Sequence, residues 1–438
     1  MGNPINHGLS IGFRAAAFDR YGNRIDHLAD TPSRSPIDVG LAWAVRYVDG
    51  TIDWEKSWPL LNTHLDEQER EHDLDDVLSG LALHMDYRWT HRRSDGSILD
   101  QTPWQKSESL VEQFIQILRV QMRQASDTAV VDTTSTSRTV AANAGNFRST
   151  AAAGTDTYGL TVGTGSGAVG LTNRALTTKV AHGTAATQLE YRATVISAPT
   201  NPTGNELRLM IDRQYNNASG GSIIIAEAAW EAQGTDGTTT WNFLLSRDLI
   251  SPTQTILNGN TATLTHRLYV DGVGLIGLLR TLYNLIANAS VSQVRADGVT
   301  DNSAANGVNL GIQNVAEGTG LGRDARGIVL GTGAGAFSPT SSALTTWIDS
   351  GVTAGRLNYL ENFFGSVTSN RRFTHRRASS NGSGGSIIVS EAGENLRVFF
   401  DQDRTVLGLR TLATAMTPSG NLTIADLGAG VFEYIHEI

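Results

Sequence analysis

The sequence contains no cysteine, and this absence excludes disulfide bonds, thiolate metal sites and cysteine nucleophiles. Long apolar runs are also missing. The most hydrophobic stretch, residues 270–291, carries Asp271, Arg280, Asn284 and Asn288, which make it too polar for a membrane-spanning helix. The opening residues show no basic, apolar signal-peptide pattern. We therefore expect a soluble protein that is made in the cytoplasm.

A strong excess of positive charge is missing as well. The 438 residues have a formal net charge of −9 and a pI of about 5.6, which argues against a dedicated nucleic-acid binder. Hydrophobic residues make up 40% of the chain, enough to form sizeable cores. The many Gly, Thr, Ser and Asn residues favour strands joined by turns. The length predicts about three domains.

What the sequence does contain is an internal duplication. Gly159–Tyr191 is repeated at Gly327–Tyr359 without a gap, every matched pair being 168 positions apart (327 minus 159). The match resumes at Ser219–Ala228 and Ser383–Ala392, now 164 positions apart (383 minus 219). The loop between the two blocks therefore differs by four residues. Because the register holds through several motifs, we read the chain as two like units.

Each unit is predicted to be a β-sandwich, because short apolar segments alternate with Gly, Ser and Asn turns. We expect the strands on either side of each Ser-Gly-Gly-Ser turn to form a hairpin. For residues 240–250 and 261–270 we expect counterparts at 396–404 and 430–438. The predicted fold class is mainly β: tandem β-sandwich-like domains with an N-terminal α+β region and short helical arms.

An amphipathic segment precedes each unit. Residues 110–124 place their apolar side chains on one helical stripe. A weaker counterpart at 275–283 aligns Arg280 with Arg119, an offset of 161 (280 minus 119). Two roles are open for the first arm, packing between subunits or packing on its own domain. The candidate subunit-packing residues are Leu110, Phe114, Ile115, Leu118 and Met122.

Residues 1–108 resemble neither unit. They hold five of the eight Trp residues and a predicted hairpin turn at Asp49–Gly50. Residues 61–85 are predicted to be helical, with Thr63 as the N-cap and an acidic, solvated face. We divide the chain into an N-terminal α+β anchoring or docking region (1–108), a first repeat (109–270) and a second repeat (271–438).

The most basic stretch is the candidate interaction surface. Its side chains alternate between the two faces of a predicted strand, so at most about half point the same way. A solvated edge strand is one interpretation, because charge on an edge suppresses unwanted pairing. Contact with an acidic neighbouring subunit or an anionic glycan is the other. The residues are Arg371, Arg372, His375, Arg376 and Arg377.

Recognisable catalytic motifs are missing. No Gly-Lys-Ser/Thr follows the Gly-Thr-Gly segments, so we interpret them as turns beside strands and propose no nucleotide site. The histidines lack the HExxH spacing, and we expect no hydrolase triad. Glu227 and Glu391 lie in separate repeats, so they are interpreted as structural residues at strand ends and not as an acid pair. We expect no enzymatic activity, cofactor or metal ion.

The paired blocks resemble a repeat found in structural proteins of tailed bacteriophages. The second copy departs from it, because Ser-Arg-Asp-Leu is not evident there and one of its strands is basic. The connector at residues 136–147 also resembles the lead-in of that repeat. The resemblance rests on Gly159–Gly165, Ala175–Gly183, Leu189–Tyr191, Ser219–Glu227 and Arg247–Leu249.

The resemblance implies a non-enzymatic component of the virion, made in the host cytoplasm and acting as a decoration, collar, tail or fibre protein. Its partners would be copies of itself, in a homo-oligomer, and other virion proteins, without nucleic acid or membrane. The alternative function is a host-surface, receptor-binding module of a tail or head fibre. Such a module would recognise glycans through loops of the second sandwich.

Overall fold

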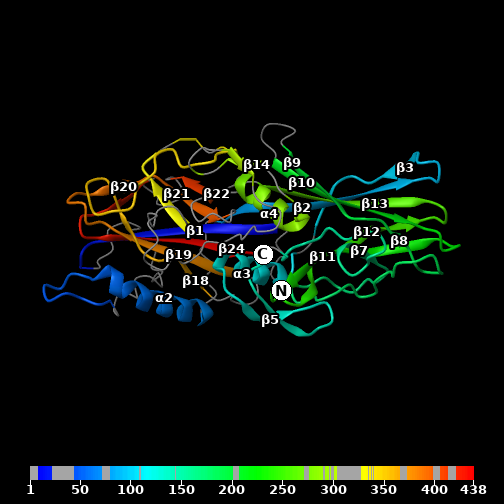
Figure 1. The fold of residues 1–438 in the computed structure, drawn as a ribbon, viewed down its shortest axis with the longest axis horizontal. Helices are drawn as coiled ribbons and strands as arrows, with labels where there is room; N and C mark the ends of the chain where they lie inside the picture. Colours follow the sequence, from blue (N-terminus) through cyan, green and yellow to red (C-terminus); the bar gives the residue numbers. More distant parts are fainter. Residues whose placement is uncertain are drawn as a thin grey trace.

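The fold is known from a computed structural model. It is mainly β in the part of the chain that it describes, as the sequence predicts, and that part holds three helices. The described residues are 8–21, 44–71, 79–107, 110–143, 145–200, 207–270, 276–289, 292–294, 296, 300–302, 327–333, 335–336, 338, 340–365, 372–397, 405–412 and 421–438. The two repeats lie end to end along the long axis of the molecule (Figure 1).

One long antiparallel sheet runs through both repeats, in the order β17-β19-β24-β1-β2-β13-β10-β8. Its strands are β17 (Asn358–Tyr359), β19 (Arg372–Ser380), β24 (Ala429–Glu437), β1 (Gly8–Phe18), β2 (Ser79–Arg92), β13 (Thr261–Val270), β10 (Leu207–Asn216) and β8 (Glu190–Tyr191). Four more strands extend its margins: β18 (Phe363–Phe364) on β19, β9 (Val195–Thr200) on β10, and β3 (Ile98–Gln101) and β4 (Gln105–Lys106) on β2.

The N-terminal strands join the two repeats. On one side β1 pairs with β24, the last strand of the second repeat, from Ser10 opposite Glu437 to Phe18 opposite Ala429. On its other side β1 pairs with β2, which in turn pairs with β13 of the first repeat. Residues 1–108 were expected to form a separate region. Their described strands, β1 to β4, belong to the one long sheet that runs through both repeats.

A second, smaller layer completes each sandwich. In the first repeat it contains β7 (Gly159–Gly163), β11 (Ile223–Thr235) and β12 (Thr240–Ile256). In the second repeat it contains β16 (Gly327–Gly331), β21 (Glu391–Arg397) and β22 (Thr405–Leu412), with β20 (Ile387–Val389) and β23 (Leu422–Ile424) as a separate pair. Two short hairpins lie outside these layers: β5 (Asp127–Val131) with β6 (Ser137–Val140), and β14 (Ser292–Val294) with β15 (Thr300–Asn302).

The hairpin expected across each Ser-Gly-Gly-Ser turn is wrong. β10 pairs with β13 and β8, whereas β11 pairs with β12 and β7, so the turn crosses from one layer to the other. The counterpart of β13 is β24, which begins one residue before the predicted range 430–438 and otherwise lies within it. The counterpart of residues 240–250 is β22 and not 396–404. Its Arg410 stands where the first repeat has Arg247.

The three helices are α2 (Trp54–Glu71), α3 (Glu112–Arg123) and α4 (Ile276–Ala287). α3 and α4 have the same length and start 164 positions apart (276 minus 112), so the offset of 161 is wrong. Shifting one helix sequence by three residues against the other still aligns their apolar stripes, because residues i and i+3 lie on the same face. The apolar pattern alone therefore does not fix the alignment. The left-handed residues after each helix, Gln124 and Asn288, fix the register. Arg280 therefore corresponds to Gln116.

The predicted helix over residues 61–85 is only partly right. α2 begins at Trp54, and Thr63 lies inside it, donating from Oγ1 to the Pro59 carbonyl at 3.1 Å. Residues 72–78 lie outside the described part. Residues from Ser79 belong to β2, in which every second side chain from Leu83 to Trp89 is buried. The Asp49–Gly50 turn is confirmed, with Gly50 donating to the Tyr47 carbonyl.

The core is continuous through both repeats. One cluster of buried apolar side chains includes Phe13 and Tyr434, on the paired strands β1 and β24, and also Trp89 of β2 and Trp230 of β11. A separate cluster, which includes Trp54 and Trp58, packs α2 on the outer face of the long sheet. The centre of the molecule is thus not a flexible linker between two domains.

We expect Leu83→Asp to destabilise the whole molecule. Leu83 is 1% exposed on β2, opposite Leu9 of β1 on one side and Val270 of β13 on the other. A carboxylate there is buried without a partner, which costs at least about 3 kcal/mol. Thermal unfolding should show a large fall in the unfolding temperature of both repeats. The control Ile98→Asp, on an exposed position of β3, should change little. Unchanged unfolding of both repeats in Leu83→Asp would contradict the shared sheet.

Candidate functional site

Each repeat contains one buried ion pair between adjacent strands of its smaller layer. In the first repeat, Arg247 donates from Nε to Oε2 of Glu227 at 2.9 Å. In the second, Arg410 donates to Oε2 of Glu391 from Nε at 3.0 Å and from Nη2 at 2.6 Å. All four side chains are at most 3% exposed. The two pairs occupy equivalent places, one per repeat.

Both pairs are held by the glycine-rich loop of their own repeat. In the first repeat, backbone N–H groups of Gly165, Thr177 and Thr178 donate to the Glu227 carboxylate at 2.8–3.2 Å. The Arg247 guanidinium donates to the carbonyls of Gly167 and Ala168 at 2.8 and 3.0 Å. These bonds replace the water that the two charges lose on burial.

The second repeat reproduces this arrangement, with its loop residues 168 positions later (335 minus 167). Arg410 donates to the carbonyls of Gly335 and Ala336, each at 3.1 Å, and to Oγ1 of Thr345 at 2.7 Å. The N–H of Thr346 donates to Glu391 at 3.0 Å. We call each set of carboxylate, arginine and loop a clamp.

The clamp explains why the motif reads Gly-Thr-Gly. A Cβ atom at Gly165 would lie 2.5 Å from Oε1 of Glu227, and one at Gly333 would lie 2.6 Å from Oε1 of Glu391. Only glycine lets the backbone approach the carboxylate this closely. The loop therefore surrounds an internal carboxylate of the protein. The sequence interpretation of these segments as turns is compatible with this, although it missed the carboxylate.

A second arginine in each repeat joins the two layers. Arg213 donates from Nη1 to the Leu160 carbonyl at 3.0 Å, and Arg377 donates in the same way to Ile328 at 2.8 Å. Each guanidinium also lies over a tyrosine ring, 4.8 Å above Tyr191 and 4.7 Å above Tyr359. The Leu-x-Tyr motif supplies these rings, so it is also structural.

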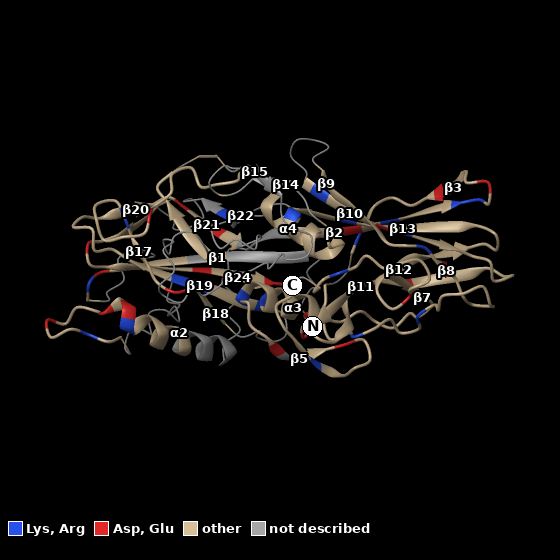
Figure 2. Ribbon diagram, viewed as in Figure 1, with Lys and Arg blue, Asp and Glu red and all other residues tan. Residues whose placement is uncertain are grey.

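The predicted basic interaction surface is therefore wrong for three of its members. His375, Arg376 and Arg377 are 0%, 0% and 3% exposed. β19 is not an edge strand, since β24 pairs with it on one side and β17 and β18 on the other. Arg372 is half-buried on β19, and Arg371 lies outside the described residues. Figure 2 shows both Lys or Arg and Asp or Glu positions on the strands of this half.

Buried acids compensate these basic groups. Arg376 donates to Glu433 at 2.6 Å, and Nδ1 of His375 lies 2.6 Å from Oε1 of Glu394. Burial alone would raise the pKa of Glu394, but the charge of His436 and the hydrogen bond with His375 lower it to about 2. Sequence reasoning missed these partners because they lie on other strands, β21 and β24, 19 and 57 residues away in the chain.

The subunit-packing residues are also placed differently from the prediction. Leu110, Phe114, Ile115, Leu118 and Met122 are all at most 2% exposed within a single chain. They therefore have no surface left for another subunit. α3 packs on β12 of its own repeat and reaches β19 of the other, while α4 packs on β22 and reaches β10. Each arm thus packs on its own repeat and reaches the other.

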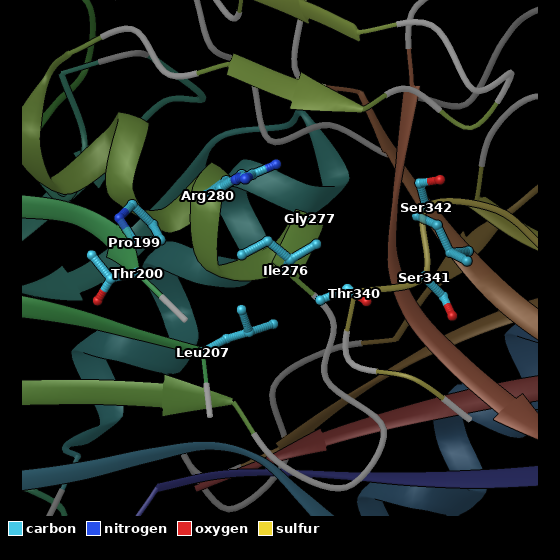
Figure 3. A pocket seen from close by; sticks show the side chains of 10 residues that line it. Pro199, Thr200, Leu207, Ile276, Gly277, Arg280, Thr340, Ser341 and Ser342 are labelled. Atoms are coloured by element: carbon cyan, nitrogen blue, oxygen red, sulfur yellow. The ribbon is translucent and has the colours of Figure 1, made fainter. Parts of the chain in front are cut away.

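A cavity of about 310 Å³ lies at this junction, beside α4 (Figure 3). The first repeat contributes Thr200 and Leu207 to its lining. The second contributes Ile276 and Arg280 from α4 and the loop at residues 340–342. The lining thus combines apolar side chains, hydroxyl groups and one cation, and it is our candidate ligand site.

Comparison with protein-family models, with curated proteins and with solved structures gave no match to this chain. In the described part of the chain, no group of three or more His, Cys, Asp or Glu side chains could hold a metal ion. Nor does any helix described there have the length and apolar character needed to cross a membrane.

We expect Glu227→Gln to lower the free energy of unfolding by about 3–5 kcal/mol, because it leaves the Arg247 guanidinium buried without its carboxylate. Glu391→Gln should have a similar effect in the second repeat. Chemical denaturation measures both. Glu190→Gln is the control, since that carboxylate is partly exposed and 3.9 Å from Arg192, and the loss should stay below about 1 kcal/mol. Equal, small losses in all three variants would show that the clamps are dispensable.

Stability should fall in acid because burial lowers the pKa of His266 to about 3. The His266 imidazole becomes protonated near pH 6.5 in the unfolded chain, but only near pH 3 in the folded chain. This contribution is complete above pH 6.5 and is lost as the pH falls toward 3. His266→Phe should reduce the slope of unfolding free energy by about 1.4 kcal/mol per pH unit in this window. Tyr434→Phe, at the equivalent position of the second repeat, should leave the slope unchanged. An unaltered slope in His266→Phe would contradict a neutral buried imidazole.

Proposed function

We propose that this chain is a non-enzymatic structural component of a tailed-phage particle. It would act through contacts with copies of itself and with other particle proteins. One observation carries the proposal: residues on which the resemblance to phage structural repeats rests form the same buried contacts in both copies. Gly165, Glu227 and Arg247 build one clamp, and Gly333, Glu391 and Arg410 build the other.

Two rigid sandwiches joined by one sheet suit a protein whose task is to hold a position. Charged side chains in the core make internal contacts, such as the hydrogen bond from Arg377 to the Ile328 carbonyl. The surface that remains for partners lies elsewhere. Such a division between a satisfied interior and contact surfaces is expected of an assembly protein.

Exposed apolar side chains offer such contact surfaces at the two ends of the molecule. The turn before α2 exposes Tyr47 and Val48, with exposed fractions of 56% and 109%. The hairpin that includes β3 exposes Ile98 and Leu99, at 53% and 41%. Figure 1 places α2 and β3 toward opposite ends of the long axis. Contacts at both ends would let copies or neighbours join along this axis.

The test is to measure the protein in gradient-purified particles of the phage that encodes it, by quantitative mass spectrometry. We expect a fixed number of copies per particle. On the order of hundreds would indicate decoration, and about a dozen or fewer a collar, tail or fibre part. Protein that stays entirely in the particle-free fraction would refute the proposal.

Two variants connect incorporation to the exposed ends. Val48→Asp and Ile98→Asp should leave the unfolding temperature unchanged but reduce incorporation of a tagged copy, because each puts a charge into an apolar contact. Thr238→Asp, on the exposed turn between β11 and β12, is the control and should be incorporated normally. Normal incorporation of both end variants would exclude these surfaces as the contacts.

A further inference from the structure

We propose that the cavity between the repeats binds a small hydroxylated carboxylic acid of the size of one acidic sugar, with the Arg280 guanidinium holding its carboxylate. The site is formed by residues of both repeats (Figure 3). Comparison of the two copies shows what occupies the corresponding place in the first repeat.

An ion pair fills the corresponding place in the first repeat. There, Glu112 at the start of α3 pairs with Arg174 of the glycine-rich loop, and Glu112 is only 2% exposed. The equivalents in the second repeat are Ile276, 164 positions later, and Ser342, 168 positions later. Both line the cavity. The internal carboxylate and its arginine are thus absent at this place in the second repeat.

The helix has changed in two further ways. Gln113 of α3 is fully buried and donates to the Val131 carbonyl, whereas its equivalent on α4 is Gly277, which lines the cavity. Gln116 corresponds to Arg280. The second repeat has therefore lost side-chain volume and gained a cation on the same helix face.

Arg280 has no acidic partner within the described residues. Its Nε is buried and makes no hydrogen bond there, and burial lowers the pKa of the guanidinium. Arg119 of α3 gives the contrast. It donates to the Gly365 carbonyl at 2.6 Å and lies 3.6 Å from a carboxylate oxygen of Asp127. A half-buried guanidinium without a partner is stabilised by an oxyanion that enters from solvent.

The rest of the lining selects the ligand class. Hydroxyl groups of Thr200, Ser341 and Ser342 can exchange hydrogen bonds with ligand hydroxyls, and within the described chain none of the three is used in a side-chain hydrogen bond. Leu207 and Leu407 offer apolar contact to ring C–H groups. The volume of about 310 Å³ lies at the lower end of small-molecule sites. A carboxylate, several hydroxyls and a compact carbon ring describe a uronic acid.

Calorimetry on the full chain tests the proposal, with D-glucuronate, D-glucose and inorganic phosphate as probes. We expect glucuronate to bind with a dissociation constant of about 1 mM or tighter, and glucose and phosphate to bind more weakly. Arg280→Gln, which restores the glutamine of the first repeat, should weaken glucuronate binding at least about tenfold. Arg192→Gln removes an exposed arginine and should bind as the natural protein does.

A second variant closes the cavity without removing Arg280. Ile276→Glu with Ser342→Arg rebuilds the ion pair of the first repeat and should abolish binding while the unfolding temperature is maintained. Absence of glucuronate binding at 10-fold above about 1 mM would overturn the proposal. Binding that is unchanged in Arg280→Gln would do the same, and phosphate binding without glucuronate binding would refute the ligand class. None of these outcomes depends on whether the protein belongs to a phage particle.

Discussion

A carboxylate removed from water is the constraint on which each repeat depends. Glu227 and Glu391 are fully buried, and a buried charge is tolerated only where donors surround it. An arginine from the neighbouring strand and N–H groups from the glycine-rich loop supply those donors. The position of one side chain thereby fixes a strand pairing and the path of a long loop.

The duplicated clamps make the differences between the repeats informative. Where the first repeat packs Ile211, Trp230 and Leu268, the second has His375, Glu394 and His436 at the equivalent strand positions. At the junction it is the first repeat that carries the charges. Its Glu112–Arg174 ion pair is replaced in the second repeat by Ile276 and Ser342. One fold therefore carries charge in different places, and each place has been compensated separately. Within the described residues Arg280 has no acidic partner, and this motivates the proposed ligand.

Much of the architecture could be predicted from the sequence, but long-range pairing could not. The duplication, the mainly β class and the helix at α3 all follow from periodicity and register. The burial of the basic strand could not be foreseen, because Glu394 and Glu433 lie on other strands. Nor could the sharing of one sheet, since pairing of β1 with β24 joins opposite parts of the chain. The clamp had a visible signal, because Glu227 and its glycines recur together at Glu391. That recurrence indicated a shared role but not a contact.

The pairing of β1 with β24 also orders events during translation. β2 can complete its contacts with β13 once the chain has reached Val270, but the partner of β1 in the second repeat is made only after residue 429. The earliest described strand must therefore wait for the latest one, with apolar residues such as Phe13 and Phe18 uncovered in the meantime. Pairings at such sequence separation fold slowly and leave strand edges open to aggregation. Rapid synthesis of the second repeat, or a chaperone that covers β1, would shorten or protect this exposed stage in the cell that makes the protein.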